Sequence, residues 1–255
     1  MEASDASAVI TLRGVHHHYR RMQALDGVEL TLPAGQLSGL IGPDGVGKST
    51  LLGLVAGVRR LQAGQVLTLG ADLSDPVQLD AVRHRIAYMP QGLGRNLYAT
   101  LSVQENLDFF GRLFGQSASA RRTRIDELTR ATGLADFIDR PAMQLSGGMK
   151  QKLGVCCALI QDPDLLILDE PTTGVDPLSR RAFWDLLYNI AGQGTTVFVT
   201  THYMDEAEYC DRVTIMVDGR IEALDTPGQL MKIYGASSMN DVFLTLARKA
   251  KNAVG

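Results

Sequence analysis

The sequence predicts an α/β fold with a largely parallel β-sheet. Short apolar runs typical of buried strands alternate along most of the chain with segments in which apolar residues recur at helical spacing. A glycine-rich turn joins one of these strands, QLSGLI, directly to one of these helices, KSTLLGLVAG. A third observation is a long stretch of helical spacing in the middle of the chain, which predicts helices inserted between two strands of the sheet.

The elements follow in order. The strand candidates are ITLRG, VELTL, LSGLI, QVLTLG, IAYMP, LLILD, TVFVTT and the pair RVTIMVDG and RIEALD. Between IAYMP and LLILD, from about Val103 to Ile160, the apolar residues recur at helical spacing and no strand candidate interrupts them. We interpret this stretch as a helical subdomain. The last stretch, MNDVFLTLARKA, predicts an amphipathic terminal helix.

The composition is that of an ordinary globular chain, with 255 residues, 45% hydrophobic and 21% charged. The net charge is -3 and the pI is near 5.9, so the chain lacks the excess of positive charge that is typical of nucleic-acid binders, and we expect no direct DNA binding. Cys156 and Cys157 lie in an apolar run, which predicts buried side chains in a reducing compartment rather than disulfides or a metal site. The N-terminus lacks a signal-peptide pattern and no apolar run approaches the ~18 residues of a membrane span, so we expect any membrane role to come through a partner.

The stretch GPDGVGKST is a complete phosphate-binding loop of the form G-x-x-x-x-G-K-[ST]. Its glycines allow consecutive backbone amides to point inward, and the N-terminus of the following helix adds partial positive charge. The alternative is a glycine-rich turn that happens to carry Lys-Ser. The predicted cradle consists of Gly42, Pro43, Asp44, Gly45, Val46, Gly47, Lys48, Ser49 and Thr50.

Three side chains of this loop predict contacts with a bound triphosphate. Lys48 would reach the β- and γ-phosphates, the hydroxyl of Ser49 would ligate a Mg²⁺ ion that bridges them, and Thr50 would contact the α-phosphate. Kinases, GTPases, helicases and transport ATPases share this motif, so the loop alone does not identify the reaction.

The stretch DLLILDEP is an apolar strand that ends in two acids, Asp169 and Glu170. Beside a phosphate loop, the first carboxylate can hold Mg²⁺ and the second can face the γ-phosphate. A hydrolase needs a carboxylate to orient and deprotonate a water molecule, so the pair favours hydrolysis over phosphoryl transfer to a bound substrate. The alternative is a solvated strand end followed by a proline stop.

The stretch LSGGMKQK opens a second helix with a serine and two glycines, Ser146, Gly147 and Gly148. This arrangement predicts a second anion-binding helix N-terminus, although a plain serine N-cap is the simpler interpretation when SGG is taken alone. The order of the motifs decides between them. The chain presents GPDGVGKST, then MPQ with Gln91, LSGGMKQK, LLILDEP, GVDP with Asp176, and TTHYMDEAE with His202.

In this series the chain resembles the nucleotide-binding domain of an ABC ATPase over nearly its whole length. The resemblance implies a P-loop NTPase (RecA-like) core with an antiparallel β subdomain and an inserted helical subdomain. We expect a single domain over residues 1–255, with core and β subdomain at 8–91 and 161–225. The helical subdomain would span 92–160 and a C-terminal helical tail 226–255.

The resemblance also implies roles for individual residues. Gln91 would sense Mg²⁺ and the attacking water, and Asp169 would hold the metal through its water shell, which gives Ser49, Gln91 and Asp169 as metal residues. Glu170 would be the general base. His202 would contact the γ-phosphate and hold Glu170 in line, although a lone histidine at a strand end is more often structural.

ABC ATPases act as ATP-dependent head-to-tail dimers, in which the phosphate loop of one subunit and the LSGG helix of the other clamp the same ATP. By resemblance, Ser146 and Gly148 would touch the γ-phosphate of the opposite subunit, and Asp176 would lie across the dimer seam. Tyr19 stands where the family places an aromatic residue that stacks on adenine, although taken alone it is as readily a surface tyrosine.

Two features depart from the common pattern. Asp44 stands where the family usually has asparagine, which places a carboxylate near the phosphates and is expected to weaken binding somewhat. The triplet His16-His17-His18 invites a metal-binding interpretation, but alternate side chains of a strand share a face, so the triplet is a poor chelate and we assign it no function.

The motifs LSGGMKQK, TTGVDP and YMDEAE resemble those of the ABC-2 exporter ATPases, and longer stretches resemble the first ATPase domain of bacterial ribosome-associated ABC ATPases. We therefore expect an exporter subunit or domain, located in the cytoplasm on the inner membrane through a membrane-spanning permease. Its second ATPase domain would be a copy of itself or a sister domain. The alternative is a soluble ribosome-associated ATPase acting in translation, and a P-loop kinase is a distant third. The expected permease-facing groove is lined by Leu93, Leu97, Tyr98 and Leu101, although such side chains are as readily core.

Overall fold

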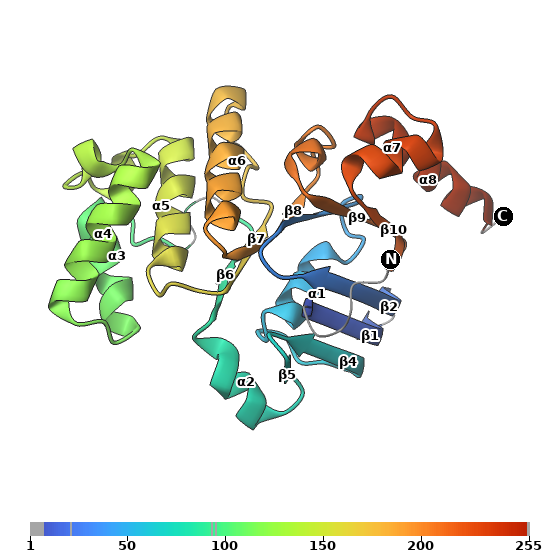
Figure 1. Ribbon diagram of the computed structural model, residues 1–255, viewed down its shortest axis with the longest axis horizontal. Helices are drawn as coiled ribbons and strands as arrows, with labels where there is room; N and C mark the ends of the chain where they lie inside the picture. The colour runs from blue at the N-terminus through green and yellow to red at the C-terminus, as the bar shows by residue number, and fades with distance from the viewer. Residues whose placement is uncertain (1–7, 21, 93, 95, 254–255) are drawn as a thin grey trace.

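The structure is a computed structural model that describes residues 8–20, 22–92, 94 and 96–253. A six-stranded sheet forms its centre, and every neighbouring pair in it is parallel except the edge pair β10 and β9 (Figure 1). In spatial order its strands are β10 (Arg220–Asp225), β9 (Arg212–Val217), β3 (Leu37–Ile41), β8 (Thr196–Thr201), β7 (Leu165–Asp169) and β6 (Ile86–Met89).

The inner strands β3, β7 and β8 are buried throughout because both faces of the sheet are covered there, whereas the edge strand β10 is partly exposed. In β7 every residue is buried, with Leu165 and Ile167 in one hydrophobic core and Leu166 and Leu168 in the other. Continuous apolar runs such as LLILD and TVFVTT therefore predicted these strands correctly, and the predicted α/β fold class is confirmed.

A second, antiparallel sheet lies beside the first. In spatial order its strands are β2 (Met22–Pro33), β1 (Ala8–Tyr19), β4 (Ala63–Thr68) and β5 (Ala71–Asp72). Helix α1 (Lys48–Val55) packs between the two sheets, and its leucines share one core with both of them (Figure 1). This sheet is the antiparallel β subdomain expected from the sequence, with the short strand β5 as an addition that the sequence analysis did not name.

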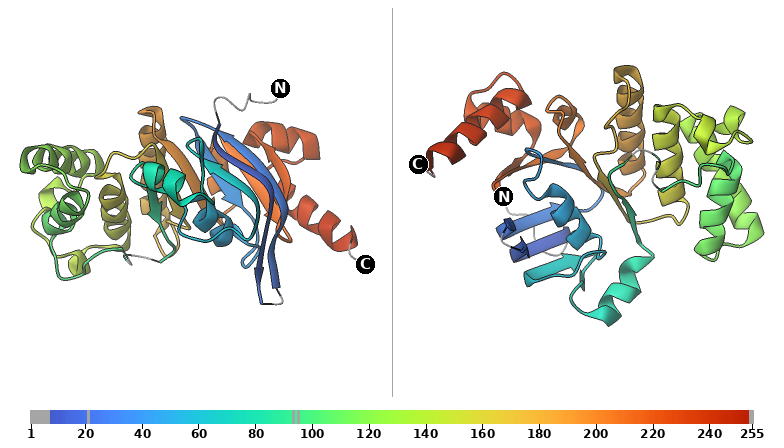
Figure 2. Two further views of the ribbon diagram at one scale, coloured as in Figure 1. Left: turned by 90° about the horizontal axis from the view of Figure 1, so that it is seen from below. Right: turned by 180° about the vertical axis from the view of Figure 1, so that it is seen from behind.

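Three helices lie to one side of the six-stranded sheet. They are α3 (Val103–Leu113), α4 (Ala118–Thr132) and α5 (Gly147–Leu159), and α6 (Pro177–Gly192) lies between them and the sheet (Figures 1 and 2). The start of α3 is fixed by a capping box, in which Ser102 Oγ accepts from Glu105 N at 3.1 Å and Glu105 Oε2 accepts from Ser102 N at 2.7 Å. The inserted helices expected between β6 and β7 are confirmed.

The remaining helices cover other parts of the molecule. They are α2 (Pro76–Arg83), α7 (Pro227–Tyr234), α8 (Met239–Ala253) and the 3₁₀ turns η2 (Ala135–Phe137), η3 (Ala142–Gln144) and η4 (Glu206–Tyr209). Helix α8 contains the predicted terminal helix. Helices α7 and α8 lie together at one end of the molecule, and α3, α4 and α5 lie at the opposite end (Figure 1). No helix in the described part of the chain is both long and apolar enough to cross a membrane.

Cys156 and Cys157 are buried, as predicted, and the rings of the histidine triplet lie in different surroundings. Cys156, Cys157 and Cys210 are buried free thiols, and burial raises the pKa of Cys156 to about 11, which keeps it uncharged. In β1, His17 is buried while His18 is exposed, so neighbouring rings of the triplet point to different surroundings.

Candidate active site

The loop between β3 and α1 is pressed against neighbouring backbone. Gly47 has φ 108°, and a Cβ atom there would lie 2.3 Å from the carbonyl oxygen of Ala24. At Gly42 a Cβ atom would lie 2.4 Å from the carbonyl oxygen of Met216. Any larger residue at either position would have to displace backbone, so the two glycines hold the loop in its tight curve at the start of α1.

Lys48 is the first residue of α1, and its side chain is buried. The ammonium nitrogen donates to the carbonyl oxygens of Gly42 at 2.8 Å and Pro43 at 3.0 Å, and lies 3.8 Å from Glu170 Oε1. Burial lowers the pKa of Lys48, and the carboxylate of Glu170 acts in the opposite direction. The loop thus holds a buried cation between its own carbonyl groups and the carboxylate that follows β7.

The two acids at the end of β7 are fixed by Thr200 on the adjacent strand β8. Its hydroxyl donates to Asp169 Oδ1 at 2.8 Å and accepts from the backbone nitrogen of Glu170 at 2.8 Å. Burial raises the pKa of Asp169, while hydrogen bonds from Thr200 and Ser49 act to lower it. Glu170 has φ 48°, in the left-handed region that non-glycine residues rarely adopt. This strained turn and the threonine together set the direction of the Glu170 side chain.

The carboxylate of Glu170 is the meeting point of the predicted catalytic residues. Its Oε2 atom accepts from Gln91 Nε2 at 2.7 Å and lies 3.4 Å from His202 Nδ1, while Oε1 faces Lys48. Thr173 Oγ1 also donates to Oε2, at 3.4 Å. Gln91, Lys48, Glu170 and His202 are far apart in sequence, and the structure brings all four side chains to one point.

A cavity of about 280 Å³ opens beside this group. The phenol of Tyr19 reaches into it and shares a hydrogen bond of 3.1 Å with Thr50 Oγ1, and the guanidinium of Arg59 lies 5.3 Å from the centre of the Tyr19 ring. Met22 and Ala24 also line the cavity, and no sequence pattern predicts either, because their role depends on how β2 packs over the loop. The lining residues are Tyr19, Met22, Ala24, Asp44, Gly45, Gly47, Lys48, Ser49, Thr50, Gln91 and Glu170.

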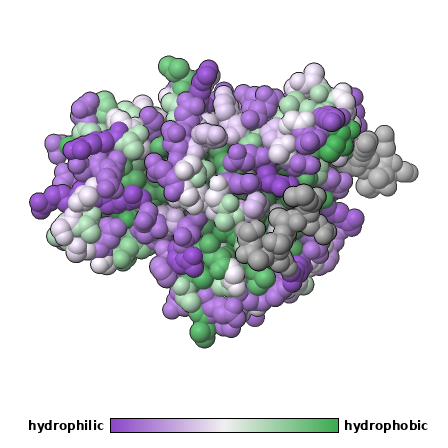
Figure 3. Space-filling model, in the orientation of Figure 1, coloured by the Kyte–Doolittle hydropathy of each residue, from purple (hydrophilic) through white to green (hydrophobic). Residues whose placement is uncertain are grey.

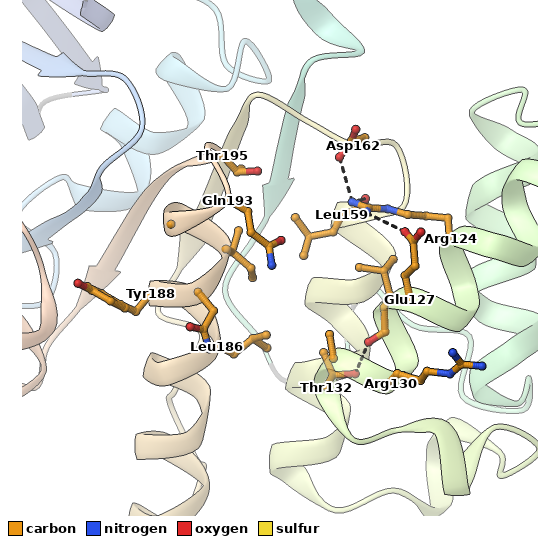
Figure 4. Close-up of a pocket in the computed structure, with 15 residues that line it drawn as sticks. Arg124, Glu127, Arg130, Thr132, Leu159, Asp162, Leu186, Tyr188, Gln193 and Thr195 are labelled. Carbon is orange, nitrogen blue, oxygen red and sulfur yellow. Dashed lines mark hydrogen bonds and ion pairs between the residues drawn. The ribbon is translucent and has the colours of Figure 1, made fainter.

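A larger cavity of about 850 Å³ lies between α4, α5 and α6 (Figure 4). Arg124 crosses its edge, where its guanidinium contacts Asp162 at 3.0 Å and Glu127 at 3.4 Å. Asp162 and Thr195 lie before the first residues of β7 and β8, at the opposite sheet edge from Asp169 and Glu170. The residues that line this cavity include none of the predicted site residues, so the smaller cavity is the candidate active site.

The LSGG serine and Asp176 each begin a helix. Ser146 Oγ accepts from Met149 N at 3.3 Å at the start of α5, and Asp176 Oδ1 accepts from Ser179 N at 3.0 Å at the start of α6. The two starts are close, because a Cβ atom on Gly148 would lie 2.8 Å from the side chain of Ser179. Ser146 and Asp176 are exposed.

The LSGG residues and Asp176 lie apart from the phosphate loop of their own chain. The residues that line the 280 Å³ cavity do not include Ser146, Gly147, Gly148 or Asp176. Of the predicted nucleotide-binding residues, the structure therefore gathers Tyr19, most of the loop, Gln91 and Glu170, and leaves the LSGG helix and Asp176 on a separate surface.

Asp44, the unusual acid of the loop, is exposed and lies near the catalytic candidates. One ligand atom each from Asp44, Glu170 and His202 lie within 4.8 Å of one another. Asp44 therefore adds negative charge at the position where a terminal phosphate is expected.

Comparison with known proteins finds a family pattern, relatives and solved structures that match most of the chain. The sequence pattern of the family described as "ABC transporter" matches residues 25–173, more than half of the chain. The probable multidrug ABC transporter ATP-binding protein YbhF of Escherichia coli is 38% identical over 241 residues, which cover 94% of this chain and 40% of that protein.

The daunorubicin/doxorubicin resistance ATP-binding protein DrrA of Streptomyces peucetius is 39% identical over 240 residues, covering 92% of this chain and 70% of that protein. Among solved structures, a dimeric ATP-binding cassette in a post-hydrolysis state, bound to ADP and Pi, superimposes with a TM-score of 0.76 at 26% identity. That match covers 85% of this chain and 98% of the other. The chain thus spans nearly all of a solved cassette and less than half of the multidrug relative.

Proposed function

The chain belongs to the ABC transporter family, and we propose that it is the ATP-binding and ATP-hydrolysing part of an exporter. The observation that carries this proposal is the buried carboxylate of Glu170, which meets Lys48, Gln91 and His202 beside a cavity lined by the phosphate loop. A phosphotransferase would leave Gln91 and His202 without a role. A hydrolase uses such a carboxylate to orient and deprotonate water.

The nucleotide would lie along the 280 Å³ cavity. The amides of Gly45 to Thr50 and the ammonium of Lys48 would hold the phosphates, as expected for a loop at a helix N-terminus. Tyr19, at the other end of the cavity, would stack on the adenine ring, since an aromatic side chain offers a flat apolar surface to any base.

The side chains at the phosphate end fit a Mg²⁺ ion. Ser49, Gln91 and Asp169 supply hydroxyl, amide and carboxylate oxygens, the hard donors that this ion prefers, and the hydroxyl of Ser49 acts to lower the pKa of Asp169. We propose these three residues as its protein ligands, directly or through water. When bound, the ion would neutralise phosphate charge.

The residues of the chain would divide the chemistry among themselves. Glu170 would accept a proton from the attacking water, and His202 and Gln91 would hold its carboxylate in place through their contacts with Oε2. Lys48, kept cationic beside Glu170, would stabilise negative charge that develops on the γ-phosphate. Water, base and cation would then meet on one side of the cavity.

The LSGG helix and Asp176 would complete the site of a second subunit. The separate surface that carries Ser146 and Asp176, with Gly147 partly exposed beside them and Gly148 buried behind, supports this proposal, because an exposed helix N-terminus without a nearby phosphate in its own chain is free to meet one from another chain. The dimeric state of the solved cassette named above supports it as well.

An exposed apolar group in the part of the chain that follows Gln91 would face the membrane partner. Tyr98 is 47% exposed, its ring centre lies 4.6 Å from that of Phe109, and Leu113 and Phe114, at the end of the helix that carries Phe109, are also exposed. Leu97 packs partly into the core, and the predicted Leu93 lies outside the described residues. Elsewhere, the face of the molecule in Figure 3 is mostly hydrophilic, with hydrophobic residues in separate patches.

We propose that this apolar group holds the chain at the cytoplasmic face of the membrane against a permease. We also retain the division into core and β subdomain at 8–91 and 161–225, helical subdomain at 92–160 and tail at 226–255 as a proposal. The exporter relatives lend no support to the alternative of a ribosome-associated ATPase.

Phosphate release by the purified chain with ATP and Mg²⁺ tests the proposal. Lys48→Ala should abolish release and sharply weaken binding of a fluorescent ATP analogue, whereas Lys232→Ala, on the exposed surface of α7, should leave both unchanged. Equal affinity and turnover in Lys48→Ala and the wild type would show that the loop is only a structural turn.

A further inference from the structure

Glu206 is a buried acid in the turn that follows His202. Its side chain is 2% exposed, and its Oε2 atom accepts hydrogen bonds from the hydroxyls of Thr172, at 2.9 Å, and Thr201. Thr172 lies two residues after Glu170, and Thr201 directly precedes His202. One carboxylate oxygen therefore ties together the two segments that carry the proposed base and its histidine.

The other oxygen of Glu206 faces Arg180, in the first turns of α6. Arg180 Nη1 lies 3.8 Å from Glu206 Oε1, which is close enough for an ion pair but too long for a hydrogen bond. Neither Glu206 Oε1 nor Arg180 Nε and Nη1 has a hydrogen-bond partner among the described residues. Buried charged groups are expensive to leave partly satisfied, so this contact is poised to tighten.

Arg180 also reaches the histidine by a second route. Its guanidinium lies 4.3 Å from the centre of the Tyr203 ring, and that ring lies 4.1 Å from the ring of His202. Its backbone nitrogen donates to the carbonyl oxygen of Asp176 at 2.9 Å, at the first turn of α6. Arg180 therefore connects the residue proposed for the dimer seam with the side chains around His202.

We propose that Glu206 is a positioning residue for Glu170 and His202, and that Arg180 links this arrangement to the start of α6. The proposal rests on the proposed ATPase function. Glu206 does not touch the cavity; it fixes the separation of the two catalytic segments. A shift of α6 by less than ~1 Å would bring Arg180 within ordinary hydrogen-bonding distance of Glu206. Assembly of a second subunit at Asp176 would thereby bring the side chains of His202 and Glu170 into their catalytic arrangement.

Glu206→Gln tests the inference with little change of volume. Because the phosphate loop is untouched, kcat should fall about tenfold, which corresponds to ~1.4 kcal/mol, while KM for ATP changes by less than about twofold. Glu208→Gln is the matched control, since Glu208 is an exposed acid of the same 3₁₀ turn and should behave as the wild type. Thermal unfolding of each variant checks that it is folded.

Two further variants keep the inference open to refutation if Glu206→Gln does not fold. Thr172→Val removes one of the two hydroxyl donors with an isosteric side chain and should lower kcat without raising KM. Arg180→Gln should lower kcat as well. Where Glu206→Gln folds, the double variant Arg180→Gln/Glu206→Gln should be no slower than the slower single variant, because the two side chains act as one unit.

The outcomes separate the two proposals. An active wild type whose kcat is unaffected by Glu206→Gln or Thr172→Val would overturn the positioning role alone. Independent, multiplicative losses in the double variant would overturn the link between Arg180 and Glu206. A folded wild type without ATP hydrolysis would overturn the proposed function and this inference with it.

Discussion

Replacing Glu170 with glutamine removes one negative charge and one proton acceptor while keeping the size of the side chain. The amide oxygen can still accept from Gln91, whose Nε2 atom lies 2.7 Å from Glu170 Oε2, but the ion pair with Lys48 at 3.8 Å is lost. An amide cannot take a proton from water. We therefore expect hydrolysis to fall by about 10² to 10⁴, the usual contribution of a general base, or ~2.7 to ~5.4 kcal/mol in the barrier.

The same change should preserve ATP binding and reveal the dimer. Loss of a carboxylate beside the γ-phosphate removes a repulsion, and an uncleaved ATP can bridge the phosphate loop of one subunit and the LSGG helix of another. A ligand that binds the closed state preferentially shifts the population toward it. Size-exclusion chromatography with light scattering should show a Glu170→Gln dimer with ATP and a monomer with ADP, and added Ser146→Arg should dissolve the dimer by blocking the second helix end.

Three results would refute this reasoning in different places. Turnover of Glu170→Gln within about twofold of the wild type would remove the base role. A mutant that stays monomeric at saturating ATP would exclude a homodimer, and the sister-domain interpretation would then predict a dimer only when the second ATPase domain is supplied. A similar loss of turnover in Glu222→Gln, an exposed acid on β10, would show that the assay reports charge in general.

Four other outcomes follow from the same geometry. If Tyr19 stacks on the base, the affinities for ATP and GTP should differ by no more than about tenfold, or ~1.4 kcal/mol. Tyr19→Ala should weaken the binding of both nucleotides in a competition assay, and an unchanged affinity would show that the ring is not part of the site. Asp44→Asn should tighten ATP about fivefold, ~1 kcal/mol for a charge ~4 Å from a phosphate in water, and a gain that does not shrink with added salt would contradict this electrostatic cause. Burial raises the pKa of Asp169, so its charged form destabilises the nucleotide-free fold at neutral pH. Asp169→Asn should therefore raise the Tm at pH 7 and lose that advantage as the pH falls below about 4, where the unfolded group is protonated too; a pH-independent difference in Tm would argue against burial as the cause. The side-chain amide of Asn106 is buried and hydrogen-bonds to backbone groups of Tyr98 and Ser102. Asn106→Ala should therefore lower the free energy of unfolding by roughly 2 to 3 kcal/mol, measured by denaturant unfolding, whereas Asn189→Ala, at an exposed position, should leave it unchanged.

The inner strands β3, β7 and β8 were predictable because each is a short buried run of the kind that a doubly covered sheet requires. Strand β5, with two residues, is too short to give such a signal, and α2 has only Val82 buried, so its apolar pattern is weak. The phosphate loop and the acids after β7 were predictable from spacing, since their chemistry is local. The convergence of Gln91 and His202 on Glu170 came from family resemblance, because only the pairing of parallel strands brings their ends together.

Other site residues carried no local signal. Thr200 acts on Asp169 because the register of β7 and β8 pairs these two residues. Glu206 appeared in the sequence as one acid among several in MDEAE, and only burial distinguishes it from Glu208. Such roles depend on tertiary contacts between segments that are distant in the chain.

The cavity draws its walls from two different sheets. Tyr19, Met22 and Ala24 belong to the antiparallel β1 and β2, whereas Glu170 follows a strand of the parallel sheet. Under the proposed base stacking, substitutions in β1 and β2 should therefore change the affinity for the nucleotide while the hydrolytic residues keep their rate. The proposed base-binding wall would then be a module that can be altered separately from the residues around Glu170.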